Sequence, residues 1–168
     1  VYLHGLVRDD KGRKMSKSLG NIIDPLDMIA TYGADATRMS LIIGTTPGND
    51  MKLSEDKVRA YKRFTNKLWN ITRFVAANTA NFDQNTPIET AEIDKKLLEE
   101  LSALTREVTG DIEKFRFYLA GEKLYRYAWH RFADEIIEES KARLAGGDEN
   151  NKRSTQYMLR TSLLTIIK

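Results

Sequence analysis

Lys14-Met15-Ser16-Lys17-Ser18, continued by Leu19-Gly20-Asn21, is the stretch from which the rest of the chain can be interpreted. Its first five residues place two ammonium groups and two hydroxyls side by side. An apolar stretch over residues 1–7 precedes it and predicts a strand, and residues 9–12 form a turn signal that ends in glycine. The pentapeptide is therefore expected on a loop. A lysine on a loop is a flexible point charge that suits a polyphosphate, and it can stabilise the charge that builds on a pyrophosphate leaving group.

Two short helices are predicted downstream of this loop. Asp24 is expected as the cap of the first and Pro25 as its first helical residue, with an end at Gly33, where a left-handed turn is favoured. The second is expected over residues 35–43. Gly44 and residues 47–50 then break the pattern. One strand and two short helices are too few to bury a core of their own.

The remainder of the chain, residues 51–168, is predicted to be helical throughout. Apolar residues recur every three or four positions in four segments, which are residues 54–80, 90–115, 118–144 and 154–168. The fourth segment is still apolar where the sequence stops, so we expect a truncated bundle. The predicted fold is mainly α: an antiparallel helical bundle over residues 51–168, preceded by a short mixed α/β segment over residues 1–50.

Composition limits the classes of function. The 168 residues are 41% hydrophobic and 30% charged with a net charge of +3, which is ordinary for a globular protein, and we expect no membrane segment. Without cysteine there is no disulfide or thiolate metal site, and with two histidines no metal site is expected. Positive charge gathers in residues 51–80, which carry seven basic and two acidic side chains and would attract a phosphate backbone.

The ordered set formed by residues 12–21, Asp24-Pro25 and residues 32–38 resembles the class I aminoacyl-tRNA synthetases, whose signature loop is the pentapeptide. The Pro47-Gly48-Asn49-Asp50 loop and the Asn66–Asn70 segment resemble the valyl-tRNA synthetases more than the isoleucyl or leucyl ones. The sequence departs from the valyl pattern at Glu135-Ile136, where that family has an aromatic pair. The resemblance implies a C-terminal fragment, with the end of the catalytic domain at residues 1–50 and an anticodon-binding bundle at residues 51–168.

The resemblance also implies the residues that act. It implies Lys17 and Lys14 as catalytic residues and Met15, Ser16 and Ser18 as further ATP-binding residues. On the first long helix, basic, amide and aromatic side chains would meet an anticodon loop: Lys67, Asn70, Arg73 and Phe74, and more weakly Arg63 and Asn66. The alternative for this helix is a solvated basic face with Phe74 in the core. We expect Trp69 to be buried, as well as the aromatic residues Tyr125, Tyr127, Trp129 and Phe132.

As a whole enzyme, such a synthetase joins valine to ATP with Mg2+ and transfers it to tRNA(Val). The fragment alone is predicted to be inactive, to bind no cofactor tightly, and to be a cytoplasmic monomer. Two alternatives remain open, a stand-alone RNA-binding helical module and a fragment of an isoleucyl or leucyl synthetase.

Overall fold

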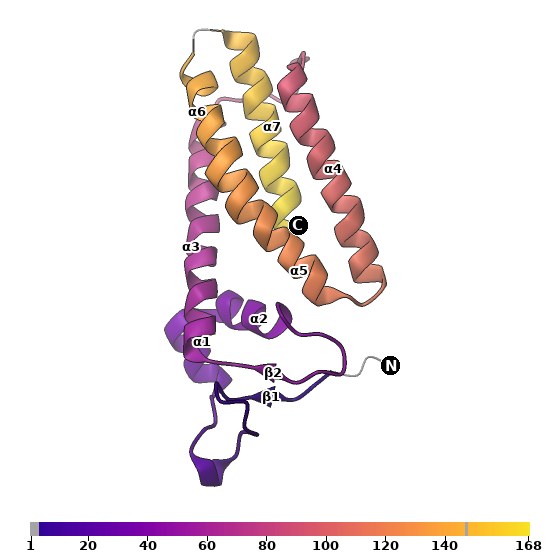
Figure 1. Cartoon of the computed structure of the whole chain (residues 1–168). Coiled ribbons are helices and arrows are strands. Elements are labelled where there is room, and N and C mark those ends of the chain that lie inside the picture. The colour runs from indigo at the N-terminus through magenta and orange to yellow at the C-terminus, as the bar shows by residue number, and fades with distance from the viewer. Residues whose placement is uncertain (1–3, 147) are drawn as a thin grey trace. The chain divides into compact units, whose positions relative to one another are not determined.

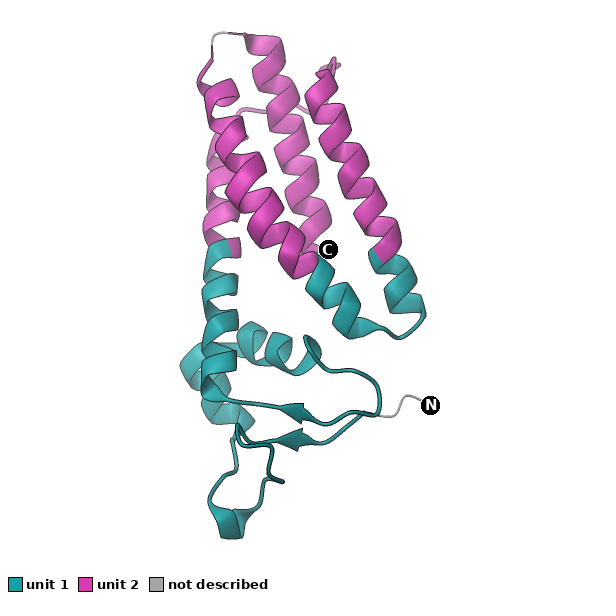
Figure 2. Cartoon of the chain, in the orientation of Figure 1, with its two compact units in different colours: residues 1–67, 108–123 teal, residues 68–107, 124–168 magenta. Residues whose placement is uncertain are grey.

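The computed structural model describes residues 4–146 and 148–168, and most of them are helical (Figure 1). By their contacts these residues form two compact units (Figure 2). The first unit comprises residues 4–67 together with Val108–Lys123, and the second comprises Leu68–Glu107 and Leu124–Lys168. Three helices have residues in both units, and each unit is therefore described by itself.

A two-stranded parallel sheet lies in the first unit. Strand β1 (Val7–Arg8) pairs with β2 (Met51–Lys52), with Val7 opposite Met51. Asp50 adds to the contact between the two segments. Its carboxylate accepts a hydrogen bond from the backbone N–H of Leu6 at 2.7 Å and forms an ion pair with Arg8. A Cβ atom at Gly5 would lie 1.8 Å from the carbonyl oxygen of Asn49, so the two segments approach this closely only with glycine at that position.

The strand predicted over residues 1–7 is wrong in extent. Its first three residues lie outside the described part of the chain, and of the rest only Val7 is in a strand. The partner strand β2 was not predicted at all. Two residues are too few to show the alternation by which a strand is recognised in a sequence.

Helices α1 (Pro25–Tyr32) and α2 (Ala34–Ile42) begin and end within a residue or two of their predicted bounds. The Asp24 side chain accepts from the amide of Leu26 at 2.8 Å and Pro25 is the first helical residue, as predicted. Gly33 between the helices has a positive φ of 92°, but its ψ of 153° is extended rather than left-handed helical. Behind the helices lies a small core that consists of Tyr32, Ala36, Leu53 and Val58.

The first long helix, α3 (Glu55–Asn78), starts as predicted, with the Ser54 hydroxyl accepting from the amide of Lys57 at 3.2 Å. The second, α4 (Glu92–Glu113), also matches its predicted segment. The predicted third helix is one run of helix made of α5 (Phe117–Arg126), a π-helical stretch η2 (Tyr127–Ile136) and α6 (Ile137–Ala145). The π-helical stretch was not predicted.

The last helix, α7 (Glu149–Ile167), begins about five residues before its predicted start. Asp148 caps it by accepting from the amides of Asn150 at 3.0 Å and Asn151 at 3.2 Å. These residues were assigned to a loop because aspartate and asparagine favour turns and helix caps alike.

The second unit is a helical bundle around a single core, which confirms the predicted fold class (Figure 1). Its helices are the last turns of α3, the first turns of α4, the run from Leu124 to Ala145, and α7, and α6 packs against α7. Phe132, Ile136, Met158 and Leu159 are fully buried at its centre. Burying each such side chain contributes about 1.5–3 kcal/mol, so this core fixes the positions of the helix faces that surround it.

None of the helices in the described residues is both long enough and apolar enough to cross a membrane.

Candidate phosphate loop and candidate tRNA-facing helix

The pentapeptide forms a short, closed loop in the first unit. It follows an antiparallel bridge between Arg8 and Lys14 and contains a single 3-10 turn, η1 (Lys17–Leu19). Ser16 caps this turn, because its hydroxyl accepts from the amide of Leu19 at 3.3 Å. Gly20 ends the turn in the left-handed conformation, with φ 61° and ψ 20°, and donates to the carbonyl of Lys17 at 3.2 Å.

Asn21 closes the loop from its far end. Its amide nitrogen donates to the carboxylate of Asp9 at 2.9 Å and to the carbonyl of Lys14 at 3.2 Å. Its amide oxygen accepts from the backbone N–H of Ser16 at 2.9 Å. One side chain therefore ties both ends of the loop to the turn that precedes it, as expected of a residue that supports the loop rather than contacts a ligand.

Asp9 is the anchor of this network and only 4% exposed. Besides the Asn21 amide, it accepts from the backbone N–H of Arg13 at 2.7 Å and from its guanidinium at 2.8 Å. The Asn21 hydrogen bond contributes most, and together with the Arg13 contacts it outweighs burial and lowers the pKa of Asp9 to about 2. The anchor therefore stays ionised at neutral pH.

The charged and the apolar side chains of the loop differ in their exposure. Lys14, Lys17 and Ser18 are exposed, whereas Met15 is half-buried and packs against the core of the first unit. The methionine thus holds the loop down while both ammonium groups remain open to solvent. His4 is exposed as well, and its ring nitrogen contacts the carbonyl of Gly5 at 2.9 Å.

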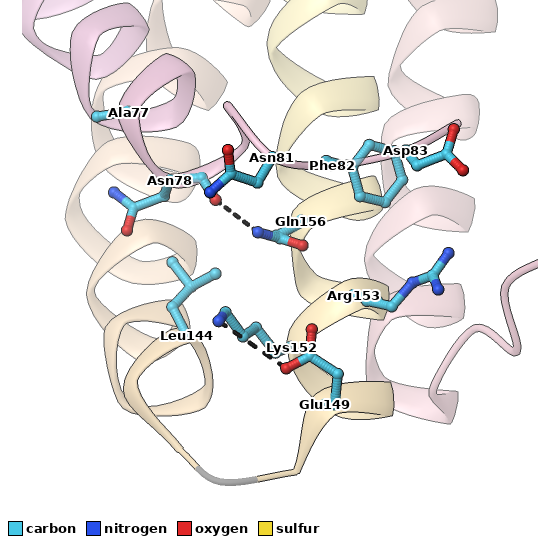
Figure 3. Close-up of a pocket in the computed structure, with 10 residues that line it drawn as sticks. All are labelled: Ala77, Asn78, Asn81, Phe82, Asp83, Leu144, Glu149, Lys152, Arg153 and Gln156. Atoms are coloured by element: carbon cyan, nitrogen blue, oxygen red, sulfur yellow. Dashed lines mark hydrogen bonds and ion pairs between the residues drawn. The ribbon is translucent and has the colours of Figure 1, made fainter. Parts of the chain in front are cut away.

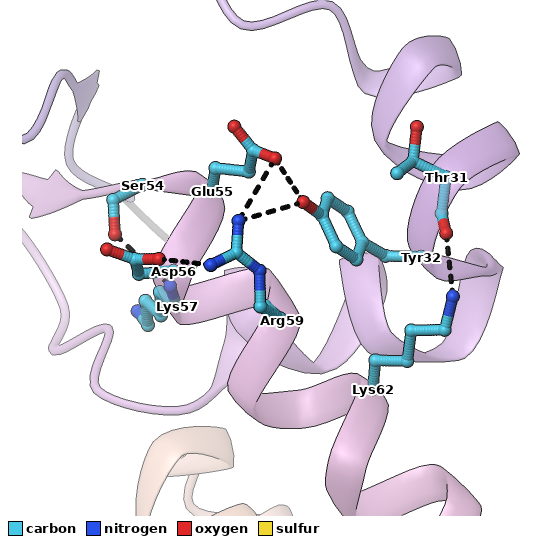
Figure 4. Close-up of polar contacts among 8 residues, drawn as sticks. All are labelled: Thr31, Tyr32, Ser54, Glu55, Asp56, Lys57, Arg59 and Lys62. Carbon is cyan, nitrogen blue, oxygen red and sulfur yellow. Dashed lines mark hydrogen bonds and ion pairs between the residues drawn. The ribbon is translucent and has the colours of Figure 1, made fainter.

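A polar cluster joins α1 to the start of α3 within the same unit (Figure 4). The Tyr32 hydroxyl donates to the Glu55 carboxylate, and this bond is the main cause that lowers the pKa of Glu55. Arg59 reaches the Tyr32 hydroxyl at 3.4 Å, and Lys62 donates to the carbonyl of Thr31 at 2.8 Å. Both cations also lie within about 6 Å of the centre of the Tyr32 ring, so this part of α3 uses its positive charge in contacts with other residues of the chain.

The predicted tRNA-contacting residues all lie on α3. In the first unit, Arg63 and Asn66 are exposed and Lys67 is half-buried. In the second unit, Asn70 and Arg73 are exposed, one turn apart. Phe74 packs partly against the bundle core, and the Lys141 ammonium lies 6.0 Å from its ring centre, so its ring is less open to a base than predicted.

Trp69 was expected to be buried, which is wrong, because it is 66% exposed. The core positions of α3 in this unit are Leu68, Ile71 and Val75. With 3.6 residues per turn they leave Trp69 on the same outer side as Asn70 and Arg73. The sequence therefore contained the signal for an exposed indole beside the candidate residues.

Of the four aromatic residues expected in the bundle core, Tyr127 and Phe132 are buried there. Tyr125 and Trp129 are half-buried and stack on each other, with ring centres 5.7 Å apart. Burial, and then the neighbouring Glu100, raise the pKa of Tyr127 to about 12. Glu100 is bound in turn by the Arg131 guanidinium at 2.9 Å, so Arg131 is occupied by an internal ion pair.

Within residues 4–146 and 148–168 no three His, Asp or Glu side chains are grouped so that they could hold a metal ion.

Two segments of the chain match known protein families. Residues 1–54 match the family of class I tRNA synthetases (I, L, M and V), and residues 94–168 match the anticodon-binding domain of tRNA ligases. The chain thus carries a segment of a class I synthetase domain and an anticodon-binding domain.

Relatives that match almost the whole chain are valine-tRNA ligases. The chain is 46% identical to the valine-tRNA ligase of Clostridium acetobutylicum over 169 residues, which cover 99% of this chain and 19% of that protein. It is 46% identical to the valine-tRNA ligase of Agrobacterium fabrum over 158 residues, or 93% of this chain and 17% of that protein. The chain spans about a fifth of the length of these relatives.

Solved structures share the fold. The methionyl-tRNA synthetase of Mycobacterium tuberculosis in complex with methionyl-adenylate matches with a TM-score of 0.79 and 23% identity, over 97% of this chain and 33% of that one. The Agrobacterium radiobacter LeuRS, solved with tRNA and LeuAMS, matches with a TM-score of 0.70 and 23% identity, over 97% of this chain and 20% of that one.

Proposed function

We propose that this chain is the C-terminal part of a valine-tRNA ligase that contains the phosphate loop and the anticodon-binding bundle. The whole enzyme would activate valine with ATP and transfer it to tRNA(Val). The observation that carries the proposal is the 46% identity to valine-tRNA ligases along almost the whole chain. Residues 1–50 would end the catalytic domain, and residues 51–168 would form the bundle.

In this function Lys17 and Lys14 would neutralise the phosphates of ATP while pyrophosphate leaves. Their exposure supports this role, since both ammonium groups can reach a ligand while Met15 and Asn21 hold the loop. Ser16 and Ser18, whose hydroxyls lie 3.2 Å apart, would shape the loop. Mg2+ would accompany ATP, held by its phosphates.

The anticodon loop would lie along α3, where Asn70 and Arg73 offer an amide and a cation beside the exposed Trp69. Arg63, Asn66 and Lys67 would extend this contact, and Phe74 would contribute less because Lys141 covers part of its ring. We further propose a cytoplasmic monomer that forms no valyl-tRNA without the rest of the ligase.

Binding to tRNA tests the anticodon part of the proposal. The 168-residue chain is titrated with a valine tRNA transcript and with transcripts that differ in one anticodon nucleotide. We expect about tenfold weaker binding for the changed anticodons and for Arg73→Ala. Arg106→Ala, which removes an exposed arginine of α4 in the same unit, is the control and should bind as the original does. Equal affinity for every tRNA would refute anticodon binding and leave a general RNA-binding module.

A chimera tests the phosphate loop. This chain replaces the matching segment of the Clostridium acetobutylicum ligase, and valine-dependent exchange between ATP and pyrophosphate is measured. Lys17→Ala should lower the exchange rate about 100- to 1,000-fold, the loss typical of removing one group that stabilises developing charge. Lys11→Ala changes an exposed lysine of the preceding turn and should have little effect. Equal rates for both variants would rule out the role of Lys17.

A further inference from the structure

A pocket of about 410 Å3 lies in the second unit, at the end of the bundle where α3 ends and α7 begins (Figure 3). This volume is within the range of about 300–1,000 Å3 that is common for ligand sites. Its walls come from the last turn of α3 and the segment after it, from the end of α6 and from the first turns of α7. The residues that the argument uses are Asn78, Phe82, Glu149, Lys152, Arg153 and Gln156.

Gln156 is the fixed polar group of this pocket. It is only 7% exposed, and its amide nitrogen donates to the carbonyl of Asn78 at 2.7 Å. This bond sets the orientation of the amide and leaves its oxygen as the free end, for which no donor exists among the described residues. This oxygen is open to the pocket and can accept a hydrogen bond from a ligand that carries an N–H donor.

The charges in the pocket are mixed. The half-buried Lys152 lies 3.9 Å from the Glu149 carboxylate, and Arg153 donates to the carbonyl of Thr86 at 3.2 Å. The Asp83 carboxylate also lines the pocket, and its pKa is lowered by the Thr86 hydroxyl and by the amide of Asn85, with a smaller effect from Arg153. Two cations beside two carboxylates do not suit a ligand with several negative charges. They suit a polar ligand with a single phosphate.

The remaining wall is aromatic. The half-buried Phe82 ring lines the pocket, with its centre 6.5 Å from that of Tyr157. Aromatic side chains stack on nucleobases, and glutamine amides form hydrogen bonds with their polar edges. A fixed acceptor, a ring and nearby cations together match one flat base with its phosphate.

The position on α3 supports an RNA source. Asn70, Arg73 and Ala77 follow one another at helical spacings of three and four residues, so they share one side of the helix. Ala77 lines the pocket. A single strand that contacts Asn70 and Arg73 would therefore reach the pocket one turn further along.

We propose that this pocket takes one unpaired nucleobase of the bound RNA loop, with an N–H donor of the base directed to the Gln156 amide oxygen and its phosphate near Lys152 or Arg153. The inference rests on the proposed function, because it names a subsite of the RNA that α3 would bind.

The test uses the 168-residue chain and a 17-nucleotide stem-loop with the valine anticodon, in which 2-aminopurine replaces one loop nucleotide at a time. One loop position should show a large fluorescence change on binding. Phe82→Leu should remove that change and weaken binding about 5- to 100-fold, as expected for a lost stacking contact. Gln156→Met should weaken binding about fivefold, since it keeps the side-chain length but loses the hydrogen bond to the base, together with the internal bond to the Asn78 carbonyl. The control is Gln84→Met, the same change at an exposed glutamine outside this pocket.

Several outcomes would overturn the pocket. If Arg73→Ala weakens binding while both pocket variants bind within twofold of the original, α3 binds RNA and the pocket does not. If the pocket variants unfold, as a thermal scan would show, the fluorescence scan of the original chain decides, and no position-specific change would overturn the inference. Binding of free AMP, CMP, GMP or UMP as tight as that of the stem-loop would assign the pocket to free nucleotides. If the stem-loop does not bind at all, the proposed function itself fails.

Discussion

Asp94 ties together the end of the bundle that contains this pocket, and removing its charge gives the sharpest stability prediction. The side chain is completely buried near the start of α4. It accepts from the Arg143 guanidinium of α6 at 2.6 Å and from the Ser154 hydroxyl of α7 at 2.6 Å. The same hydroxyl accepts from the amide of Ala91 at 2.8 Å. Three helix ends therefore depend on one carboxylate.

Asp94→Asn keeps the shape of the side chain and one oxygen acceptor but leaves the Arg143 charge without its partner. Breaking a buried ion pair in this way costs about 3–5 kcal/mol. The lower end applies here, about 3 kcal/mol, because the Arg143 side chain is 21% exposed and keeps some contact with water. For a chain of this size about 1 kcal/mol corresponds to roughly 2–4 °C, so Tm should fall by about 6–12 °C.

Thermal and urea unfolding followed by circular dichroism would measure the loss. The matched control is Glu138→Gln, the same kind of change in an exposed pair, where the carboxylate lies 2.7 Å from Lys141 and the two side chains are 58% and 51% exposed. Such a pair contributes at most about 1 kcal/mol, so the control should lose no more than about 4 °C.

A double variant identifies the cause. Arg143→Met alone should also destabilise, because it leaves the buried Asp94 carboxylate with Ser154 as its remaining partner, while Asp94→Asn with Arg143→Met should lose clearly less than the sum of the two. Additive losses to within about 0.5 kcal/mol would show that the two side chains do not interact. The reasoning would also be refuted if Asp94→Asn were no more harmful than Glu138→Gln.

Three further predictions concern the phosphate loop, the bundle core and α3. Asn21→Ala should raise the pKa of Asp9 from about 2 toward its usual value, because the Asn21 amide is the largest cause of the shift. Carboxyl 13C NMR follows this directly. Since the folded pKa is lowered, the stabilising effect of Asp9 is complete above pH about 4 and disappears as the pH falls through about 2, and an unchanged Asp9 titration in the variant would contradict the network. Tyr127 should ionise only near pH 12. Its raised pKa stabilises the fold below pH about 10, and this effect is lost as the pH rises toward 12. Tyr127→Phe should remove that step from an ultraviolet titration, and ionisation near pH 10 in the folded chain would disprove burial of the phenol. Trp69→Ala should weaken tRNA binding about 5- to 100-fold and leave the free energy of unfolding within about 0.5 kcal/mol, because the indole is 66% exposed. The reverse, a stability loss with unchanged affinity, would show that Trp69 packs against the protein.

Helix positions were largely predictable because their signals are local. Asp24 with Pro25 and Ser54 each cap a helix within three residues of where they stand in the sequence, and the apolar spacing fixes which face of α3 is buried. The two-stranded sheet was not predictable, because its contacts join Leu6 to Asp50, 44 residues away. No local sequence pattern predicts a pair of strands with only two residues each.

The candidate sites, too, were predictable only where the signal lies within a short stretch of sequence. The resemblance identified the phosphate loop, but not the Asn21 amide that spans twelve residues to reach Asp9. Nor could any periodicity reveal that Gln156 and Asn78, 78 residues apart, meet at the edge of a pocket. Exposure of Trp69 was different, because the spacing of the core residues already implied it.

A count of basic residues does not show which cations of α3 are free of internal contacts and can bind RNA. Residues 51–80 contain seven basic side chains, but in the first turns of α3 Arg59 is bound by Asp56 at 2.9 Å and by Glu55, and Lys62 is bound by the Thr31 carbonyl. Arg73, in contrast, is exposed. Each phosphate contact that is lost lowers the dependence of the logarithm of affinity on the logarithm of salt concentration by about 0.7 for a single strand. We therefore expect Arg73→Gln to reduce the salt slope of tRNA binding by that amount, and Arg59→Gln to leave it unchanged. Equal effects of the two substitutions would mean that internal ion pairs do not decide which cations meet RNA.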